Sequence, residues 1–286
     1  MMRSIAMILG TILAILFLIQ LFRGQKYEEL VEGLEEKEFP LKDIYTVGFS
    51  WAELPPLRLR GVLFERLEQN AKVLYGEMYA EYYANVYYAM ALSFFHFILC
   101  FGCLLAGWQD NRNFFYLGIF LAIVGLIYGC DSMRQKLVKR TENCETELPE
   151  VVSTMAILVN SGMILRDAWN MVGGRGEGDI YALMRDASED IRNGHADSEA
   201  IAKFGRATNS PEIIKFTSAL MQSMGKGAGE LPLFLARQSS DLWNEKKQRL
   251  LQKGEQASAK LLMPIMLIFL GIIIIILSSA FAGISL

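Results

Sequence analysis

Two glycine-rich segments are the first candidates for chemistry, because glycine lets backbone N–H groups approach a phosphate closely. They are residues 173–178 (GGRGEG) and 225–229 (GKGAG). Neither follows a predicted strand, and neither has the G-x-x-x-x-G-K-[ST] spacing of a P-loop. Since turns between helices use the same residues without a ligand, we interpret both segments as turns and expect no bound cofactor.

Histidine and cysteine, which often serve as catalytic bases, nucleophiles or metal ligands, are scarce in this chain, with two and four copies. Cys100 and Cys103 have the C-x-x-C spacing of a redox or zinc pair, but they lie in an apolar run with no second pair nearby. His96 lies in the same run and His195 in a polar turn, so the two form no joint site. We expect apolar packing for the cysteines and a structural hydrogen bond for His96.

Acidic residues form two groups that could hold a cation, namely Glu142, Glu145, Glu147 and Glu150, and Glu189 with Asp190. Solvated helix faces and acids that complement helix N-termini explain such groups more often than metals do. We therefore assign no metal site and no catalytic residue, and the sequence does not predict an enzyme.

The charges are distributed unevenly along the 286 residues. All 28 Lys and Arg and all 31 Asp and Glu lie outside four runs, residues 4–22, 82–109, 113–130 and 261–286. A helix needs about 20 residues to cross a hydrocarbon core of about 30 Å. The sequence therefore predicts an all-α, polytopic membrane protein with four transmembrane helices and a cytoplasmic helical bundle. Spans without a single formal charge argue against ion transport, and a net charge of -3 argues against binding to nucleic acid.

Basic residues near the ends of the runs predict the topology, because Lys and Arg favour the cytoplasmic side. They follow the third run and precede the fourth, at Arg134, Lys136, Lys139, Arg140, Lys246, Lys247, Arg249, Lys253 and Lys260. We therefore place residues 23–81 and 131–260 in the cytoplasm and both termini outside. The first run is interpreted as a retained anchor, since no small-x-small cleavage site follows it.

Five parts are expected: a first span (1–22), juxtamembrane helices (23–81), a transmembrane hairpin (82–130), a bundle (131–260) and a last span (261–286). Helical periodicity predicts helices over 27–38 and over 57–88, the second continuing into the hairpin. The bundle is predicted to contain about six helices. One begins at Leu148-Pro149, another has Ser210 as N-cap and Pro211 at its first position, and residues 231–260 continue into the last span. An aromatic belt at the membrane surface is predicted from Tyr79, Tyr82, Tyr83, Tyr87 and Tyr88.

The second half of the chain has an ordered series of short signatures. They include Leu148-Pro149-Glu150, Asn160-Ser161-Gly162-Met163, Asn193-Gly194, Ser210-Pro211, the glycine turn 225–229 and Lys260-x-x-Met263-Pro264. In their order and spacing, residues from about 148 to the end resemble the F-domain family of type II secretion and type IV-like pilus platforms. Within that family they are most similar to the tight-adherence (Tad/Flp) platform proteins. Leu270-Gly271 departs from the family pattern, where a second proline is expected.

The resemblance implies a non-enzymatic platform in the cytoplasmic membrane, which couples a hexameric cytoplasmic assembly ATPase to the extraction and export of pilins. A paralogous platform protein and an oligomeric state, homomeric or heteromeric, are implied as well. Exposed turns of the bundle are the candidate partner-binding surface, at Gly162, Gly194, Arg206, Gly225 and Gly229. Two alternatives from other classes remain open: a membrane-bound signalling or regulatory protein with a helical partner-binding domain, and a transporter subunit.

Overall fold

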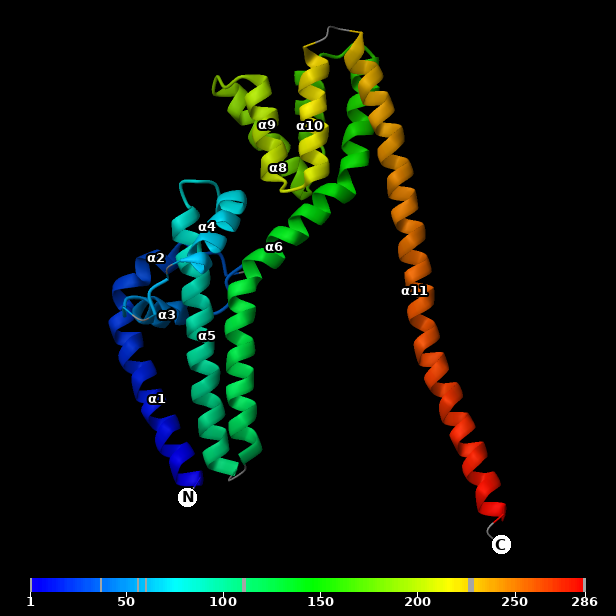
Figure 1. The fold of residues 1–286 in the computed structure, drawn as a ribbon. Coiled ribbons are helices and arrows are strands. Elements are labelled where there is room, and N and C mark those ends of the chain that lie inside the picture. Colours follow the sequence, from blue (N-terminus) through cyan, green and yellow to red (C-terminus); the bar gives the residue numbers. More distant parts are fainter. Residues whose placement is uncertain are drawn as a thin grey trace. The chain divides into compact units, whose positions relative to one another are not determined.

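The computed structural model describes residues 2–36, 38–55, 57–59, 61–109, 112–225 and 229–284, and all regular structure within them is helical (Figure 1). The all-α expectation is thus confirmed for this part of the chain. The helices are α1 (Met2–Gly24), η1 (Gln25–Tyr27), α2 (Glu28–Glu32), η2 (Lys42–Ile44), α3 (Tyr45–Ala52), α4 (Val62–Tyr75), α5 (Ala80–Gln109), α6 (Arg112–Asn160), α7 (Leu165–Gly173), α8 (Asp179–Arg192), α9 (Asp197–Ala207), α10 (Pro211–Met224) and α11 (Glu230–Ile284).

Four of these helices, α1, α5, α6 and α11, are long and apolar enough to cross a membrane. They contain the first three charge-free runs and the fourth as far as Ile284. The chain divides into two compact units, Met1–Glu142 with Arg206–Asn209, and Asn143–Gly205 with Ser210–Leu286.

Close backbone approach holds together the apolar helices of the first unit. A Cβ on Gly102 of α5 would lie 2.6 Å from the Cα of Gly118 on α6, and one on Gly118 would lie 2.8 Å from the Cα of Gly102. Small residues that admit this spacing are how membrane helices gain van der Waals contact. On the other face of α5, His96 Nε2 lies 3.0 Å from the carbonyl oxygen of Leu13 on α1, which confirms the structural hydrogen bond expected for this histidine.

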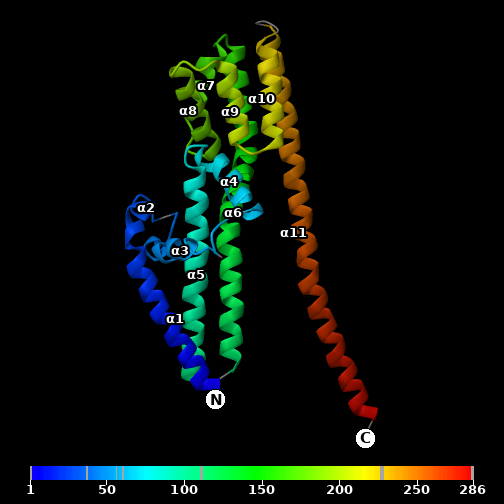
Figure 2. The ribbon, with the colours of Figure 1, turned by 60° about the vertical axis from the view of Figure 1, so that its left-hand side comes forward.

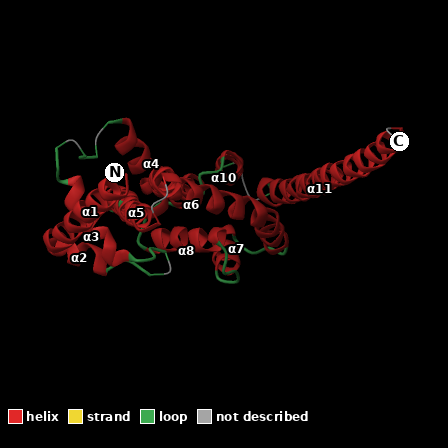
Figure 3. Cartoon of the chain, turned by 90° about the horizontal axis from the view of Figure 1, so that it is seen from below, coloured by secondary structure: helices red, strands yellow, loops and turns green. Residues whose placement is uncertain are grey.

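The short helices α2, α3 and α4 pack against the first part of α5, as Figure 3 shows for α2 and α3 beside α1 and α5. Their common core, here called the tyrosine core, contains Phe39, Tyr45, Leu67, Val86 and Tyr87. Phe39 meets the Tyr87 ring edge-on, with 5.3 Å between centroids.

The tyrosine core corrects the aromatic-belt interpretation. Tyr87 is buried, and Tyr82, Tyr83 and Tyr88 are packed against the core, whereas Tyr79 is 55% exposed. The hydroxyl of Tyr88 donates to the carbonyl oxygen of Leu57 at 2.8 Å. These rings cluster because three short helices cover them, a tertiary effect that hydropathy alone does not show.

Two helix boundaries in this region differ from expectation. The helix predicted over 57–88 is two helices, because Gly76 between them has φ of +84°, a left-handed conformation that ends α4. The helix predicted over 27–38 is shorter, with η1 and α2 ending at Glu32. Val31 and Leu34 are buried in the tyrosine core, so the apolar spacing marks packing rather than a long helix.

In the second unit, the later part of α6 packs with α7–α11 around a core that includes Leu148, Met155, Ile180, Met184, Ile213, Leu220 and Leu235. The α10 start is confirmed, since Ser210 Oγ accepts from the Ile213 N–H at 3.3 Å and Pro211 occupies the first helical position. The start predicted at Leu148-Pro149 is wrong: α6 continues through Pro149. Proline leaves the carbonyl of Glu145 without its i+4 donor, yet flanking helical turns and buried Leu148 keep the helix intact.

Helix α11 is continuous over 55 residues, about 80 Å at 1.5 Å per residue. Its continuity from the bundle into the last apolar run confirms that part of the prediction. Leu235 and Leu242 are buried, but every residue from Lys247 to Leu270 is exposed within the described chain.

Candidate partner-binding surface

Gly162 and Gly194 end two helices with the same backbone conformation and hydrogen-bond pattern. Each has φ of +96°. After α6, the N–H of Gly162 donates to the Val159 carbonyl at 3.0 Å, and the next N–H donates to the carbonyl of Leu158 at 3.1 Å. After α8, Gly194 and His195 donate in the same pattern to Ile191 and Asp190. This is the Schellman motif, which explains both glycines by conformation alone.

An ion pair joins these two glycine turns. Arg166, at the start of α7, lies with its Nη2 2.5 Å from Oδ1 of Asp197, at the start of α9. Helix α7 packs against α8, and the Trp169 indole donates to the Met184 carbonyl at 3.0 Å. The turns that contain Gly162 and Gly194 therefore lie side by side.

The end of α10 and the start of α11 lie toward the same end of the unit (Figure 2). Helices α6 and α11 are antiparallel, because Ser153 contacts Ser239 whereas Thr146 contacts Lys246. The first turn of α11 therefore lies toward the Gly162 end of α6. Gly225 and Gly229 are exposed, and residues 226–228 between them lie outside the described residues. We call the turns at Gly162, Gly194 and Gly225–Gly229 together the turn end.

Arg206 does not belong to the turn end. It lies in the last turn of α9, after which the chain turns into α10. At the start of α10, Ser210 donates to Glu145 Oε1 on α6 at 2.7 Å, about 25 Å along that helix from Gly162. Arg206 groups with the first unit and is exposed. The predicted surface is thus one cluster of four glycines and a separate arginine.

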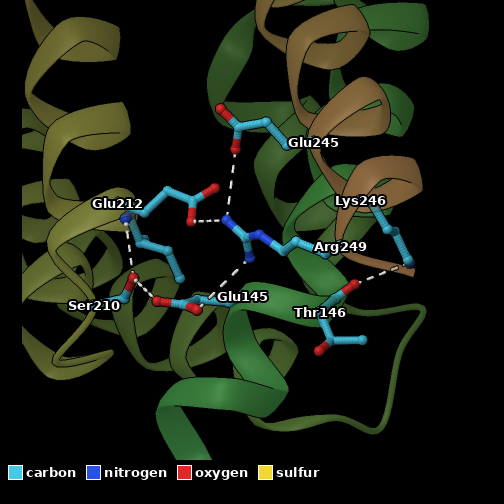
Figure 4. A network of polar contacts seen from close by, with 8 residues as sticks. Glu145, Thr146, Ser210, Glu212, Glu245, Lys246 and Arg249 are labelled. Atoms are coloured by element: carbon cyan, nitrogen blue, oxygen red, sulfur yellow. Dashed lines mark hydrogen bonds and ion pairs between the residues drawn. The ribbon is translucent and has the colours of Figure 1, made fainter. Parts of the chain in front are cut away.

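A polar network at the other end of the second unit joins three helices (Figure 4). Arg249 of α11 places Nη2 2.5 Å from Glu212 Oε2 of α10 and Nη1 3.8 Å from Glu145 Oε2 of α6. Glu245, one turn earlier on α11, lies 3.5 Å from the same Nη2. A guanidinium has five donors in a fixed fork, which suits it to several carboxylates at once. We call this the Arg249 network.

Further bonds between α6 and α11 continue from this network. Lys246 Nζ donates to the Thr146 carbonyl at 3.0 Å, within the turn that Pro149 weakens. Trp243 Nε1 donates to Ser153 Oγ at 2.7 Å, and Ser153 also bonds Ser239 at 2.7 Å. The contacts fix α11 to the bundle as far as Arg249, just inside the exposed part of the helix that begins at Lys247.

The comparisons with known proteins bear on this unit. Residues 151–282 match the family of type II secretion system protein F. The match covers the end of α6, helices α7–α10 and nearly all of α11. Neither the curated proteins nor the solved structures gave a match.

Within this protein F segment and the residues before it, the described side chains include no cluster of three or more His, Cys, Asp or Glu suited to a metal. Two of the acids predicted to be solvated or to complement helix N-termini form ion pairs instead. Glu145 belongs to the Arg249 network, and Asp190 pairs with Lys203 at 2.8 Å. Such contacts are suited to holding helices in place.

Glu147, just before the protein F match, has an unusual environment for an acid. Its carboxylate accepts from the backbone of Ile180 at the start of α8 and fills the space beside Gly178. Gly178 caps α8 without a side chain, so Glu147 supplies a hydrogen-bond acceptor at that N-terminus from another helix. Oε2 is buried without a partner among the described atoms. Burial raises the pKa of this carboxyl, and the Ile180 bond lowers it by less.

Sequence reasoning missed the Arg249 network and the role of Glu147. Glu145, Glu212 and Arg249 are separated by 67 and 37 positions and resemble ordinary surface charges in the sequence. The one available signal was Ser210-Pro211-Glu212, which places Glu212 in the first turn of α10, where an acid is favoured.

Proposed function

We propose that the protein is an inner-membrane platform subunit of a type II secretion or type IV-like (Tad/Flp) pilus machine, which couples a cytoplasmic assembly ATPase to pilin extraction and export. Support comes from the protein F match over residues 151–282 and from the four helices able to cross a membrane. The single observation that carries the coupling role is α11, one helix from bundle to apolar run.

A continuous helix suits this task because it transmits displacement along its axis without absorbing it in a loop. The Arg249 network and the Trp243 and Lys246 bonds attach α11 to α6 and α10. Beyond Arg249, the next 11 residues reach Lys260, the last charge before the apolar run. A movement of the bundle would therefore be delivered to the membrane segment of α11.

The turn end is the surface we assign to the ATPase. Along α11, Glu230 is about 45 Å from residue 261, where the apolar run starts. The turn end is thus the part of the second unit farthest along α11 from the membrane segment. Ile164, which follows Gly162, is 63% exposed and offers an apolar contact there. In this proposal the second unit faces the cytoplasm, as the basic residues that flank the apolar runs favour. A paralogous platform protein and pilins are the further partners.

A complementation experiment tests the coupling role. In a deletion strain, Gln256→Pro interrupts α11 between the Arg249 network and the apolar run, because proline removes an i→i−4 bond and kinks the helix. Gln256→Ala is the matched control. We expect pilus assembly with the control and its loss with the proline variant at equal amounts of membrane-inserted protein. Normal pili in the uncomplemented deletion strain would refute the proposed function. Normal pili with the proline variant would refute the transmission of movement along α11.

A second experiment tests the ATPase-facing surface. Ile164→Lys places a charge at the turn end, and Val62→Lys on α4 is a control of similar exposure, 65% against 63%. Co-purification of the cytoplasmic assembly ATPase of the same machine should be lost only with Ile164→Lys. Arg206→Glu, in the separate turn, reports whether that position belongs to the binding surface. Equal ATPase recovery for all three variants would show that the turn end is not the contact.

A further inference from the structure

An open cavity of about 650 Å³ lies in the first unit, where the ends of α1 and α3 meet the start of α5. Gln20 and Arg23 of α1 line it, with Ser50 and Glu53 at the end of α3, Arg58 in the following loop and Glu81 of α5. Its lining thus mixes buried polar groups with charged ones.

The cavity is at the boundary of the apolar runs. Arg23 is the first charged residue after run 4–22, and Glu81 is the last before run 82–109. Gln20 lies three residues inside the first boundary, and Asn85, also in the lining, lies four residues inside the second. One helical turn is about 5.4 Å, so the cavity extends about one turn to the apolar side. This is the depth at which phospholipid headgroups meet the hydrocarbon core.

The floor of the cavity is built from polar side chains that are more than nine-tenths buried. Gln20 is 6% exposed and Ser50 is 5% exposed. The Ser50 hydroxyl donates to Gln20 Oε1, which directs the carbonyl end of Gln20 toward α3 and leaves its amide N–H groups as donors. Among the described atoms, no acceptor pairs with that amide nitrogen.

The charges at the cavity favour an anion. Lys26 pairs with Glu53, with Nζ 2.5 Å from Oε1, so Arg23, Arg58 and Lys26 exceed Glu53 and Glu81 by one positive charge. Arginine presents a planar fork that matches the oxygen atoms of a phosphate. Tyr27 and Phe49, stacked with centroids 5.5 Å apart, add an aromatic wall.

We propose that this cavity binds a membrane phospholipid, whose phosphate is held by Arg23 and Arg58 and whose glycerol oxygens accept from Gln20. Three observations support it: a cavity at headgroup depth, a buried polar floor, and an excess of one positive charge among Arg23, Arg58, Lys26, Glu53 and Glu81. The proposal depends only on α1 and α5 crossing the membrane, and is independent of the platform function.

The test is lipid binding to the purified full-length protein in detergent, measured by native mass spectrometry with a phosphatidylglycerol probe. Arg23→Gln with Arg58→Gln should weaken binding of one lipid by about tenfold, the scale of two lost charge-assisted contacts. Arg134→Gln, next to the third apolar run but outside the cavity, is the matched control and should leave affinity unchanged. Ala52→Phe narrows the cavity without changing charge and should weaken binding as well.

Each alternative has a distinct outcome. Unchanged affinity in the double variant, or an equal loss with Arg134→Gln, would overturn the proposal in favour of general surface attraction. Displacement of the lipid by excess inorganic phosphate would show a site for free phosphate instead. Thermal unfolding of each variant in detergent must match the wild type, and Ala52→Phe decides the matter if the double variant does not fold.

Discussion

Arg249 on α11 and Glu212 on α10 form the closest charged contact of the network that holds α11 to the bundle, with 2.5 Å between Nη2 and Oε2. The two side chains come from helices separated by one turn of chain, yet the pair lies at the end remote from that turn. The ion pair therefore holds α10 and α11 together at the end where no connecting segment joins them.

Replacement of Arg249 should weaken the attachment of α11 to α10. We expect Arg249→Gln to lower the free energy of unfolding by about 1 kcal/mol, since the side chain is 46% exposed and solvent weakens its ion pairs. Arg249→Lys should recover only part of the loss, because an ammonium has no planar fork. Thermal unfolding in detergent measures both. Arg237→Gln, an exposed arginine earlier on α11, is the control. An equal loss with Arg237→Gln would show that general charge, not the network, is responsible.

Glu147 predicts a pH dependence of stability. Burial raises the pKa of its carboxyl in the folded state above the ordinary value of 4.5. As pH rises, the unfolded chain releases the proton first, so the folded state binds more protons in this window and stability falls with rising pH. Glu147→Gln keeps an acceptor for the Ile180 N–H but cannot ionise.

The variant should therefore match or exceed the wild type in melting temperature at neutral pH, and its advantage should shrink as pH falls toward 4.5. The measurement is the difference between the two melting curves at each pH, which cancels the other titrating groups. A difference that is constant from pH 4.5 to pH 7 would contradict the assignment.

The glycines of the turn end are predicted to differ in their tolerance of alanine. Gly162 and Gly194 have φ of +96°, so alanine at either position should cost about 1 kcal/mol of folding free energy. Gly225 has φ of -75° and no close neighbour that a methyl group would strike, so Gly225→Ala should be neutral or slightly stabilising. Chemical denaturation measures the three variants, and equal destabilisation by all of them would exclude a conformational explanation.

Gly102 predicts a packing effect within the α5–α6 hairpin. A methyl group there would overlap the backbone at Gly118, so we expect Gly102→Ala to destabilise the hairpin by about 1–3 kcal/mol, as overpacking does elsewhere. Gly271 lies in the apolar part of α11 with open space around its Cα, and Gly271→Ala is the matched control. Resistance to unfolding in mixed detergent reports the difference. Unchanged resistance to unfolding in Gly102→Ala would show that α5 and α6 can shift apart enough to accept the methyl group.

Features with a strong local signal were predictable from the sequence. The four apolar runs contain no formal charge, so their helices could be placed, and Ser210-Pro211 marked the start of α10 through its own cap. Features that depend on distant residues were not. Gly76 looks like a tolerated glycine within a helical pattern, but its positive φ divides α4 from α5. Pro149 looks like a helix start, but packing around it keeps α6 continuous.

The candidate site shows the same division. Gly162 and Gly194 could be identified as helix-ending glycines, because the residues before them are helical and the motif is local. Their proximity through Arg166 and Asp197, and the separation of Arg206 from them, depend on how four helices pack. The cavity at Gln20 and Arg58 was missed for the same reason, since its lining comes from segments up to 65 positions apart.

The exposed apolar stretch of α11 has a consequence for how this protein can vary among species. Side chains such as Leu262, Ile268 and Ile275 are 61%, 64% and 70% exposed, so exchanges among apolar residues there leave the described fold almost untouched. In the proposed platform, selection at these positions would come from the surrounding lipid and neighbouring subunits. Sequence drift along this helix should therefore follow changes in membrane composition and in the partner chains, while Gly102 and Gly118 stay fixed by the chain's own geometry.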